Sequence, residues 1–432
     1  MSGAGRHGEG RLGAPSPSAL SPAATPDDFP VTSPGAWAPA VAVPPGLLAR
    51  PRRRGSVLFT VLVSVLLLLG AGVMCVVLLM SNAPGALAIG VVLAALPVGP
   101  VIASFLWLDR YEPEPVRFLV LAFFWGAVVA TAAALVLQSI DQIVLGTPDD
   151  WSAAIVAPIT EEGAKGLFVL LLLWFRRRVI DGVLDGIVYA GIVGVGFAFT
   201  ENILYLAGAF MGSGPGGPGG LGSATGLFVV RGIFSPFAHP LFTSFIGLGV
   251  GFAVVAKKKH WRFLAPLLGY LAAVTAHATW NASAFFGGGS AFVLTYVFAM
   301  VPAFLLLVGF AVWARRREAR MLTRSLSDCA ARGLIGAYEV PWLVRLSARR
   351  ESRRYARGYG GPVAERVMRE YQQQAIELAF LHDRFLRGNA PSDFTERGSA
   401  MVQRLHALRP YVQYPQPRGQ AVPGYARTEA RR

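Results

Sequence analysis

The chain has 432 residues, of which 53% are hydrophobic and 15% are charged, and its mean hydropathy is +0.48. This composition is too apolar for a soluble enzyme and leaves room for several membrane spans. The net charge of +15 raises the question of a nucleic-acid partner, but the basic residues flank apolar runs and form no single basic face. Cys75 and Cys329 are too few for a disulfide framework or a thiolate metal site. We therefore expect a polytopic membrane protein that binds no nucleic acid.

The first 54 residues are rich in Pro, Ala, Gly and Ser and have little apolar periodicity. Such a segment cannot bury enough apolar surface to fold, and no short apolar core of a signal peptide precedes the first full span. We expect a disordered cytosolic tail over 1–54.

Eight apolar runs of about 20 residues follow, each long enough to cross a hydrocarbon core of roughly 30 Å. They predict an all-α fold: a polytopic membrane helical bundle of about eight transmembrane helices over residues 55–313. The predicted spans are Val57–Met80, Gly85–Leu108, Val116–Leu137, Ser152–Trp174, Val183–Ala207, Leu227–Val255, Leu264–Phe285 and Ala291–Trp313.

Basic residues occur before the first run, in every second gap and after the last run, whereas the other gaps contain no Lys or Arg. By the positive-inside rule, this alternation predicts that both termini are cytoplasmic. The chain after Trp313 is rich in Arg, and Val363–Leu386 has the apolar spacing of a helix. We expect a cytosolic basic helical region over 314–408, which stabilises the last helix or a dimer or docks a regulatory partner, and a disordered tail over 409–432.

Ionisable side chains lie inside four consecutive predicted spans. A charged residue near the bilayer centre costs a few kcal/mol, so a cluster of them is typical of a functional site. At about 1.5 Å per residue, Glu161 and Glu162 lie roughly 15 Å below the outer start of their span, and Glu201 and His277 lie about 9 and 12 Å from the outer ends of theirs. His239 lies at a similar level. We expect these residues to meet in one layer, from mid-bilayer toward the outer leaflet.

Spacing within each helix adds detail. Glu161 and Lys165 are four residues apart, and so are His277 and Asn281, so each pair shares a helix face. Glu161 and Glu162 are about 100° apart, and we expect only one of them to contact a reacting water. Arg231 either extends to the outer surface or faces the acidic cluster.

These residues form sequence motifs. EEGAK, FAFTEN, the lone His239 and HATWN resemble the signature of the PrsW family of intramembrane proteases, of the type EExxK, FxxxE, His and HxxxN. DRYEPEP, over Asp109–Pro115, also resembles a segment frequent in that family. The related CAAX-processing and bacteriocin-processing proteases have EExxxR and FxxxH, from which this chain departs at Lys165 and Glu201. The similarity covers Asp109 to Asn281 and favours the PrsW branch.

The resemblance implies cleavage of a membrane-anchored protein, such as an anti-sigma factor, near the extracytoplasmic side of a bacterial plasma membrane. Glu161, supported by Glu162, would activate a water as general base, His239 and His277 would position that water or a metal, and Asn281 would stabilise the oxyanion. Lys165 and Glu201 complete the implied catalytic set. His239, His277 and Glu162 would form a zinc set if the enzyme is metal-dependent, but HExxH is absent and a metal-free glutamate mechanism uses the same residues.

Two other functions use the same polar residues. A proton- or ion-coupled transporter also needs intramembrane Glu, Lys and His, although transporters often have broken helices in two inverted halves, which four consecutive polar spans do not suggest. A non-catalytic membrane protein could bind peptides at the same site. The preference for Arg over Lys and the many Ala and Gly residues are typical of a GC-rich bacterial source.

Overall fold

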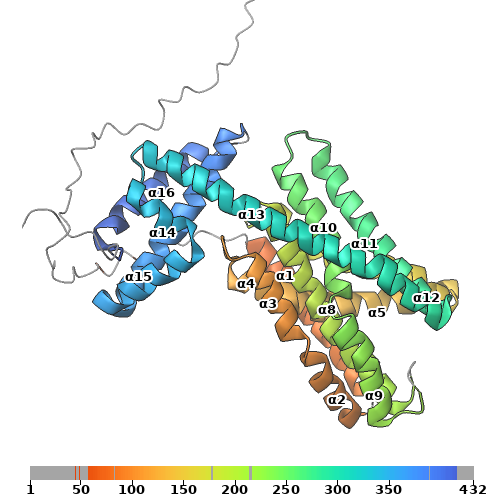
Figure 1. Ribbon diagram of the computed structural model, residues 1–432. Helices are drawn as coiled ribbons and strands as arrows, with labels where there is room; N and C mark the ends of the chain where they lie inside the picture. Colours follow the sequence, from red (N-terminus) through yellow and green to blue (C-terminus); the bar gives the residue numbers. More distant parts are fainter. Residues whose placement is uncertain are drawn as a thin grey trace, which may run out of the picture. The chain divides into compact units, whose positions relative to one another are not determined.

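The computed structural model describes residues 44, 48, 57–81, 83–176, 179–213, 217–388 and 390–415. Within these ranges the regular elements are helices, and no strand is found (Figure 1). The predicted all-α membrane fold is confirmed. Nearly all of the predicted tail over 1–54 and the end of the tail over 409–432 lie outside the described residues.

Seven helical segments of the described chain are long and apolar enough to cross a membrane. The predicted span over 152–174 is also helical, as the π-helix η5 (Ser152–Val156) and α7 (Ala157–Phe175). It does not belong to the apolar set, because Glu161, Glu162 and Lys165 give it three charged side chains. The eight predicted apolar spans are therefore seven apolar segments and one charged helix. The seven are Val57–Met80, Pro84–Leu108, Val116–Leu145, Val183–Met211, Gly220–Val255, Trp261–Phe285 and Gly289–Ala331.

Four of these segments consist of more than one helical element, and the seventh contains α12, η7 and α13, whose bounds are given below. The second consists of α2 (Pro84–Ala95) and α3 (Val98–Leu108), which are separated at Pro97 because proline has no N–H to donate. The third contains α4 (Val116–Phe124), the π-helix η3 (Trp125–Ala130), α5 (Thr131–Ile140) and the π-helix η4 (Asp141–Leu145). The segment predicted as one span over 227–255 is α9 (Gly220–Phe228), the π-helix η6 (Val229–Phe234) and α10 (Ala238–Val255). The break between η6 and α10 places His239 in the first turn of a helix.

The remaining elements of the membrane unit are α1 (Val57–Met80), α6 (Asp149–Trp151), α8 (Val183–Met211), α11 (Trp261–Phe285), α12 (Gly288–Thr295), the π-helix η7 (Tyr296–Met300) and the start of α13 (Val301–Ala331). This unit covers Arg50–Arg320, and a second compact unit begins at Met321.

Helix α8 is buried along most of its length and packs against α2, α10 and η3 (Figure 1). Glycines allow the close approach: a Cβ at Gly186 would lie 2.1 Å from the Gly247 carbonyl oxygen of α10. A Cβ at Gly126 of η3 would lie 1.9 Å from the Val193 carbonyl oxygen of α8. Small residues at helix crossings let two backbones touch in a membrane protein. The polar residues of α8 and α10 are thereby brought within side-chain reach of each other.

The helices α7 and α11 join this core by similar contacts. A Cβ at Gly249 of α10 would lie 2.3 Å from the Ala265 carbonyl oxygen of α11. The indole Nε1 of Trp125 donates to the Ala164 carbonyl oxygen of α7 at 2.9 Å. The four helices that carry the sequence motifs thus form one packed group.

The second unit holds the 3-10 helix η8 (Ala337–Glu339), α14 (Val340–Val344), α15 (Leu346–Leu386), α16 (Phe394–Leu408) and the 3-10 helix η9 (Arg409–Tyr411). The helix that apolar spacing predicts over 363–386 is thus the second half of α15, which is bent at Gly361, where φ is +65°. The buried Glu339 accepts a hydrogen bond from the Tyr371 hydroxyl at 2.5 Å and pairs with Arg409 at 3.3 Å.

Candidate active site

Three charged side chains of α7 form the centre of the site. Glu161 is 6% exposed, and Glu162 and Lys165 are fully buried. Lys165 follows the two carboxylates by one helical turn, so its ammonium reaches both. Its Nζ lies 2.8 Å from Glu162 Oε1 and 3.2 Å from Glu161 Oε2. The buried cation offsets part of the cost of burying two carboxylates.

Both oxygens of Glu162 are occupied by protein groups. Oε1 contacts Lys165 and lies 3.1 Å from His277 Nδ1, and Oε2 accepts a hydrogen bond from the Thr243 hydroxyl at 3.0 Å. Glu161 has fewer close partners, because its Oε1 receives a long contact of 3.4 Å from Gln138 Nε2. The two neighbouring carboxylates therefore differ in how much room they leave for a water molecule.

His277 of α11 is fixed by two contacts. Its ring stacks on Phe242 with centroids 4.8 Å apart and an interplanar angle of 16°. Because Nδ1 faces the carboxylate of Glu162, we assign the ring proton to Nδ1. Nε2 then presents its lone pair on the side of Glu161, whose Oε2 is 3.9 Å away.

His239 of α10 lies between a cation and a carboxylate. Its Nδ1 is 3.2 Å from Lys165 Nζ, and its Nε2 is 2.7 Å from Glu201 Oε2. An ammonium can only donate, so Nδ1 accepts and Nε2–H donates to Glu201. The ring centroids of His239 and His277 are 5.1 Å apart. The two imidazoles therefore meet in the same layer as the α7 carboxylates.

Arg231 of η6 faces the acidic cluster, which decides between the two orientations that the sequence left open. Its Nη2 donates to Glu201 Oε2, and its Nε donates to Asn202 Oδ1 at 2.6 Å. The guanidinium carbon lies 4.3 Å from the centroid of the Tyr205 ring. Arg231 and His239 thus contact the same oxygen of the Glu201 carboxylate.

The aromatic residue of the FxxxE motif, Phe197, contacts the buried cation of the site. Lys165 Nζ lies 3.6 Å from the centroid of its ring, which is 2% exposed. A cation over an aromatic face gains electrostatic stabilisation, most strongly away from water. Phe197 therefore stabilises the buried ammonium from a helix other than α7.

The structure does not bring Asn281 into this cluster through its amide. Asn281 Nδ2 donates to the Ala153 carbonyl oxygen at 2.8 Å and so ties α11 to η5. Sequence reasoning missed Thr243 and Gln138, which contact Glu162 and Glu161. Thr243 is one helical turn after His239, and that spacing on a common face was the available signal.

Glu161, His239 and His277 could hold a metal ion. Their ligand atoms all lie within 4.8 Å of one another, and two imidazoles with one carboxylate are a common zinc ligand set. The carboxylate in this group is Glu161, whereas the sequence-based ligand set names Glu162. Glu162 instead faces the Nδ1 of His277, as the outer partner of a metal-binding histidine does. The residue types and the distances between their ligand atoms therefore fit zinc. Two of the three residues, Glu161 and His239, also contact the Lys165 ammonium.

A second cluster of acidic side chains lies at the other end of α8. Asp185 precedes Glu201 by sixteen residues, about 24 Å along the helix. The ligand atoms of Asp109, Glu114 and Asp185 also lie within 4.8 Å of one another. The backbone N–H of Glu114 donates to Asp109 Oδ2 at 2.7 Å, and the hydroxyl of Tyr189 donates to Glu114 Oε2 at 2.8 Å. The DRYEPEP segment therefore fixes the turn between α3 and α4 against α8.

Burial raises the pKa of Asp109 to about 8. The hydrogen bond from the Glu114 backbone lowers this pKa, and the charge of Asp185 raises it further. Burial and the neighbouring Asp185 and Asp109 raise the pKa of Glu114 well above its usual value. Asp109 therefore retains its proton near neutral pH.

The chain is similar to a family of known proteins. The model of the PrsW family, described as intramembrane metalloproteases, matches residues 114–307. The chain is 30% identical to Protease PrsW of Bacillus subtilis (strain 168) over 119 residues, which are 27% of this chain and 54% of that protein. It is 27% identical to Protease PrsW of Geobacillus kaustophilus (strain HTA426) over 172 residues, which are 40% of this chain and 70% of that protein.

With Protease PrsW of Shouchella clausii (strain KSM-K16), the chain shares 27% identity over 239 residues, which are 54% of this chain and 98% of that protein. No solved structure matches the chain. The matched region contains the four motif helices, and their polar side chains meet in one buried layer. The chain is a multi-pass membrane protein whose residues 114–307 resemble the PrsW family of intramembrane proteases.

Proposed function

We propose that this chain is an intramembrane endopeptidase that hydrolyses a peptide bond in a membrane-anchored protein. The observation that carries the proposal is the grouping of Glu161 with His239 and His277 inside a membrane unit. Hydrolysis needs a base for the attacking water, which the Glu161 carboxylate can supply, and a group that orients this water, which the Nε2 lone pair of His277 can supply. The resemblance to the PrsW family supports the same reaction.

Glu161 is the general base in this proposal. The oxygens of Glu162 are engaged by Lys165, His277 and Thr243. Glu161 is the more exposed of the two, and its Oε1 has only the long contact with Gln138 among the described residues. A base must lie within hydrogen-bond reach of the proton that it removes, and Glu161 is the carboxylate with room for that water.

The surrounding groups hold the reacting side chains in place. Glu162 orients His277 through Nδ1, and Glu201 orients His239 through Nε2. Lys165 pairs with both carboxylates of α7, and Arg231 pairs with Glu201. Asn281, for which the sequence suggests an oxyanion role, acts in this proposal by fixing η5 against α11.

Glu161, His239 and His277 would hold a zinc ion if the enzyme is a metalloprotease. A bound zinc would supply a Lewis acid for the scissile carbonyl. Glu161 takes the proton of the attacking water in this proposal, with or without a metal.

The substrate in this proposal is a single-span protein, such as an anti-sigma factor, cut near the extracytoplasmic side of a bacterial plasma membrane. The alternating basic clusters support cytoplasmic termini, which place the start of α7 on the outer side. Glu161 then lies about 18 Å along the continuous helix that starts at Asp149.

Co-expression with tagged single-span proteins tests the proposed function. We expect a truncated product that is absent when the same substrates are co-expressed with His277→Ala at an equal protein level. Cleavage that persists in His277→Ala would contradict the proposed site. Ion flux through purified protein in vesicles, without any cleaved product, would instead identify a transporter.

A further inference from the structure

A cavity of about 210 Å³ lies at the end of the membrane unit where α1 and α4 begin and α7 ends. It is separate from the candidate active site, since Arg176 follows Glu161 by fifteen residues, about 22 Å along α7. The wall includes two guanidinium groups, two hydroxyl groups and four apolar side chains. They belong to Arg117 and Arg176, to Thr60 and Ser64, and to Phe59, Val63, Phe118 and Leu121.

The two guanidinium groups meet over one aromatic ring. The Cζ atoms of Arg117 and Arg176 lie 4.7 and 5.8 Å from the centroid of Phe118, and Arg176 Cζ is also 5.1 Å from the centroid of Phe59. Burial and the like charge of Arg117 lower the pKa of Arg176. Two positive charges that converge on the same hollow repel each other, and an anion between them would remove the repulsion and accept hydrogen bonds from both.

The position in the membrane points to the source of that anion. Thr60 and Ser64 are the fourth and eighth residues of α1, about 5 and 10 Å from its start. This is the depth at which phospholipid headgroups give way to acyl chains, because the polar layers are only some 5–8 Å thick on each side of the core.

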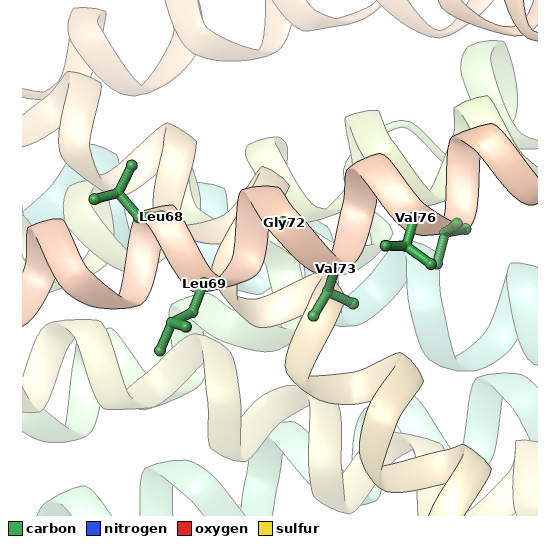
Figure 2. A pocket seen from close by; sticks show the side chains of 6 residues that line it. Leu68, Leu69, Gly72, Val73 and Val76 are labelled. Atoms are coloured by element: carbon green, nitrogen blue, oxygen red, sulfur yellow. The ribbon is translucent and has the colours of Figure 1, made fainter.

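An apolar path continues from the cavity along α1. From Thr60 and Ser64, steps of four residues lead to the exposed Leu68, Gly72 and Val76, and because each step turns by about 40°, this stripe winds around α1. Figure 2 shows Leu68, Leu69, Gly72, Val73 and Val76 along α1. Together with Val77 they line a hollow of about 400 Å³. None of the described atoms comes within 4 Å of a Cβ built at Gly72, apart from its own helix backbone and chain neighbours. The stripe is long enough to carry an acyl chain through one leaflet.

We propose that this cavity binds the phosphate of an anionic phospholipid, with one acyl chain of the lipid lying along the α1 stripe. Arg117 and Arg176 donate to the phosphate oxygens, and the hydroxyl groups of Thr60 and Ser64 are placed to donate as well. Basic pockets between membrane helices on the cytoplasmic side are suited to anionic headgroups. The bound lipid would bridge α1, α4 and the end of α7.

Native mass spectrometry of the full chain in detergent, titrated with phosphatidylglycerol, tests this proposal. We expect one phosphatidylglycerol to bind at least tenfold more tightly than phosphatidylcholine. The double variant Arg117→Gln/Arg176→Gln should bind it at least tenfold more weakly, because two charge-assisted contacts are lost. The matched control Lys257→Gln/Arg262→Gln removes two positive charges on the predicted same side of the membrane and should retain the affinity of the unmodified chain.

Two further arms test for misfolding and for binding of free phosphate. Arg117→Lys/Arg176→Lys retains the charges and should bind phosphatidylglycerol more tightly than the glutamine variant, which distinguishes lost charge from a damaged fold. An excess of inorganic phosphate should leave the lipid adduct in place, because phosphate lacks the acyl chain. The proposal is overturned if the glutamine variant and the Lys257/Arg262 control bind equally, if phosphatidylcholine binds as tightly, or if inorganic phosphate displaces the lipid.

Discussion

Lys165→Met removes the cation that contacts both carboxylates of α7. The ammonium lies 2.8 Å from Glu162 and 3.2 Å from Glu161, and the three side chains are at most 7% exposed. Removing one partner of a buried ion pair costs about 3–5 kcal/mol, because the remaining charge stays buried. Glu162 retains its contacts with Thr243 and His277, and Glu161 loses its closest partner. We expect Lys165→Met to lower the free energy of unfolding by about 3–5 kcal/mol.

The assay is reversible unfolding in mixed detergent micelles, followed by circular dichroism. The double variant Lys165→Met/Glu162→Gln should recover at least half of the loss, since it no longer buries two carboxylates without a cation. Lys257→Met is the matched control at an exposed position and should change the free energy of unfolding by less than about 0.5 kcal/mol. A loss below about 1 kcal/mol for Lys165→Met, or a double variant no more stable than the single one, would refute the argument.

Three further predictions address other parts of the structure. The unmodified chain should lose stability relative to Asp109→Asn as pH rises from about 4 to 8. In the unfolded chain Asp109 loses its proton near pH 3.8, whereas in the folded chain it keeps the proton up to about pH 8. Over this range folding requires Asp109 to take up a proton, and this cost is absent from the asparagine variant. A difference in melting temperature that does not change with pH would contradict this. Arg231→Gln should lower the cleavage rate about tenfold, and Arg231→Lys should restore most of it, as expected for one charge-assisted contact to Glu201; full activity of the glutamine variant would show that the contact is not needed. Chelation should inactivate the enzyme and added zinc should restore it, whereas full activity in metal-stripped protein would remove zinc from the mechanism.

The sequence alone was enough to predict that the motif residues lie close together. Four consecutive spans, whose directions follow from the predicted topology, place Glu161, Glu201, His239 and His277 at similar depths, because the rise per residue is constant in an α-helix. The structure brings these side chains into one cluster. Depth gives no rotation about the helix axis, however, and so it could not tell which histidine nitrogen faces which carboxylate.

Other features depend on contacts between distant residues. The break before α10 was missed because the residues on both sides are apolar enough to form one continuous span. The orientation of Arg231 depends on Asn202 and Glu201, which are 29 and 30 residues away in sequence. Likewise, Thr243 and His277 occupy the oxygens of Glu162 from two other helices, and this contact, invisible in the EEGAK motif itself, separates the roles of the two glutamates.

The cleavage rate of purified Glu161→Gln tests the central claim most directly. A general base contributes about 10²–10⁴-fold to the rate, so single-turnover cleavage of a membrane-anchored substrate should fall by that factor. Substrate cross-linking and the unfolding transition should remain close to those of the unmodified chain, and Glu365→Gln, the same change in the second unit, should cleave at the normal rate. A Glu161→Gln variant that retains more than about one tenth of the rate would contradict the assignment of Glu161 as the base.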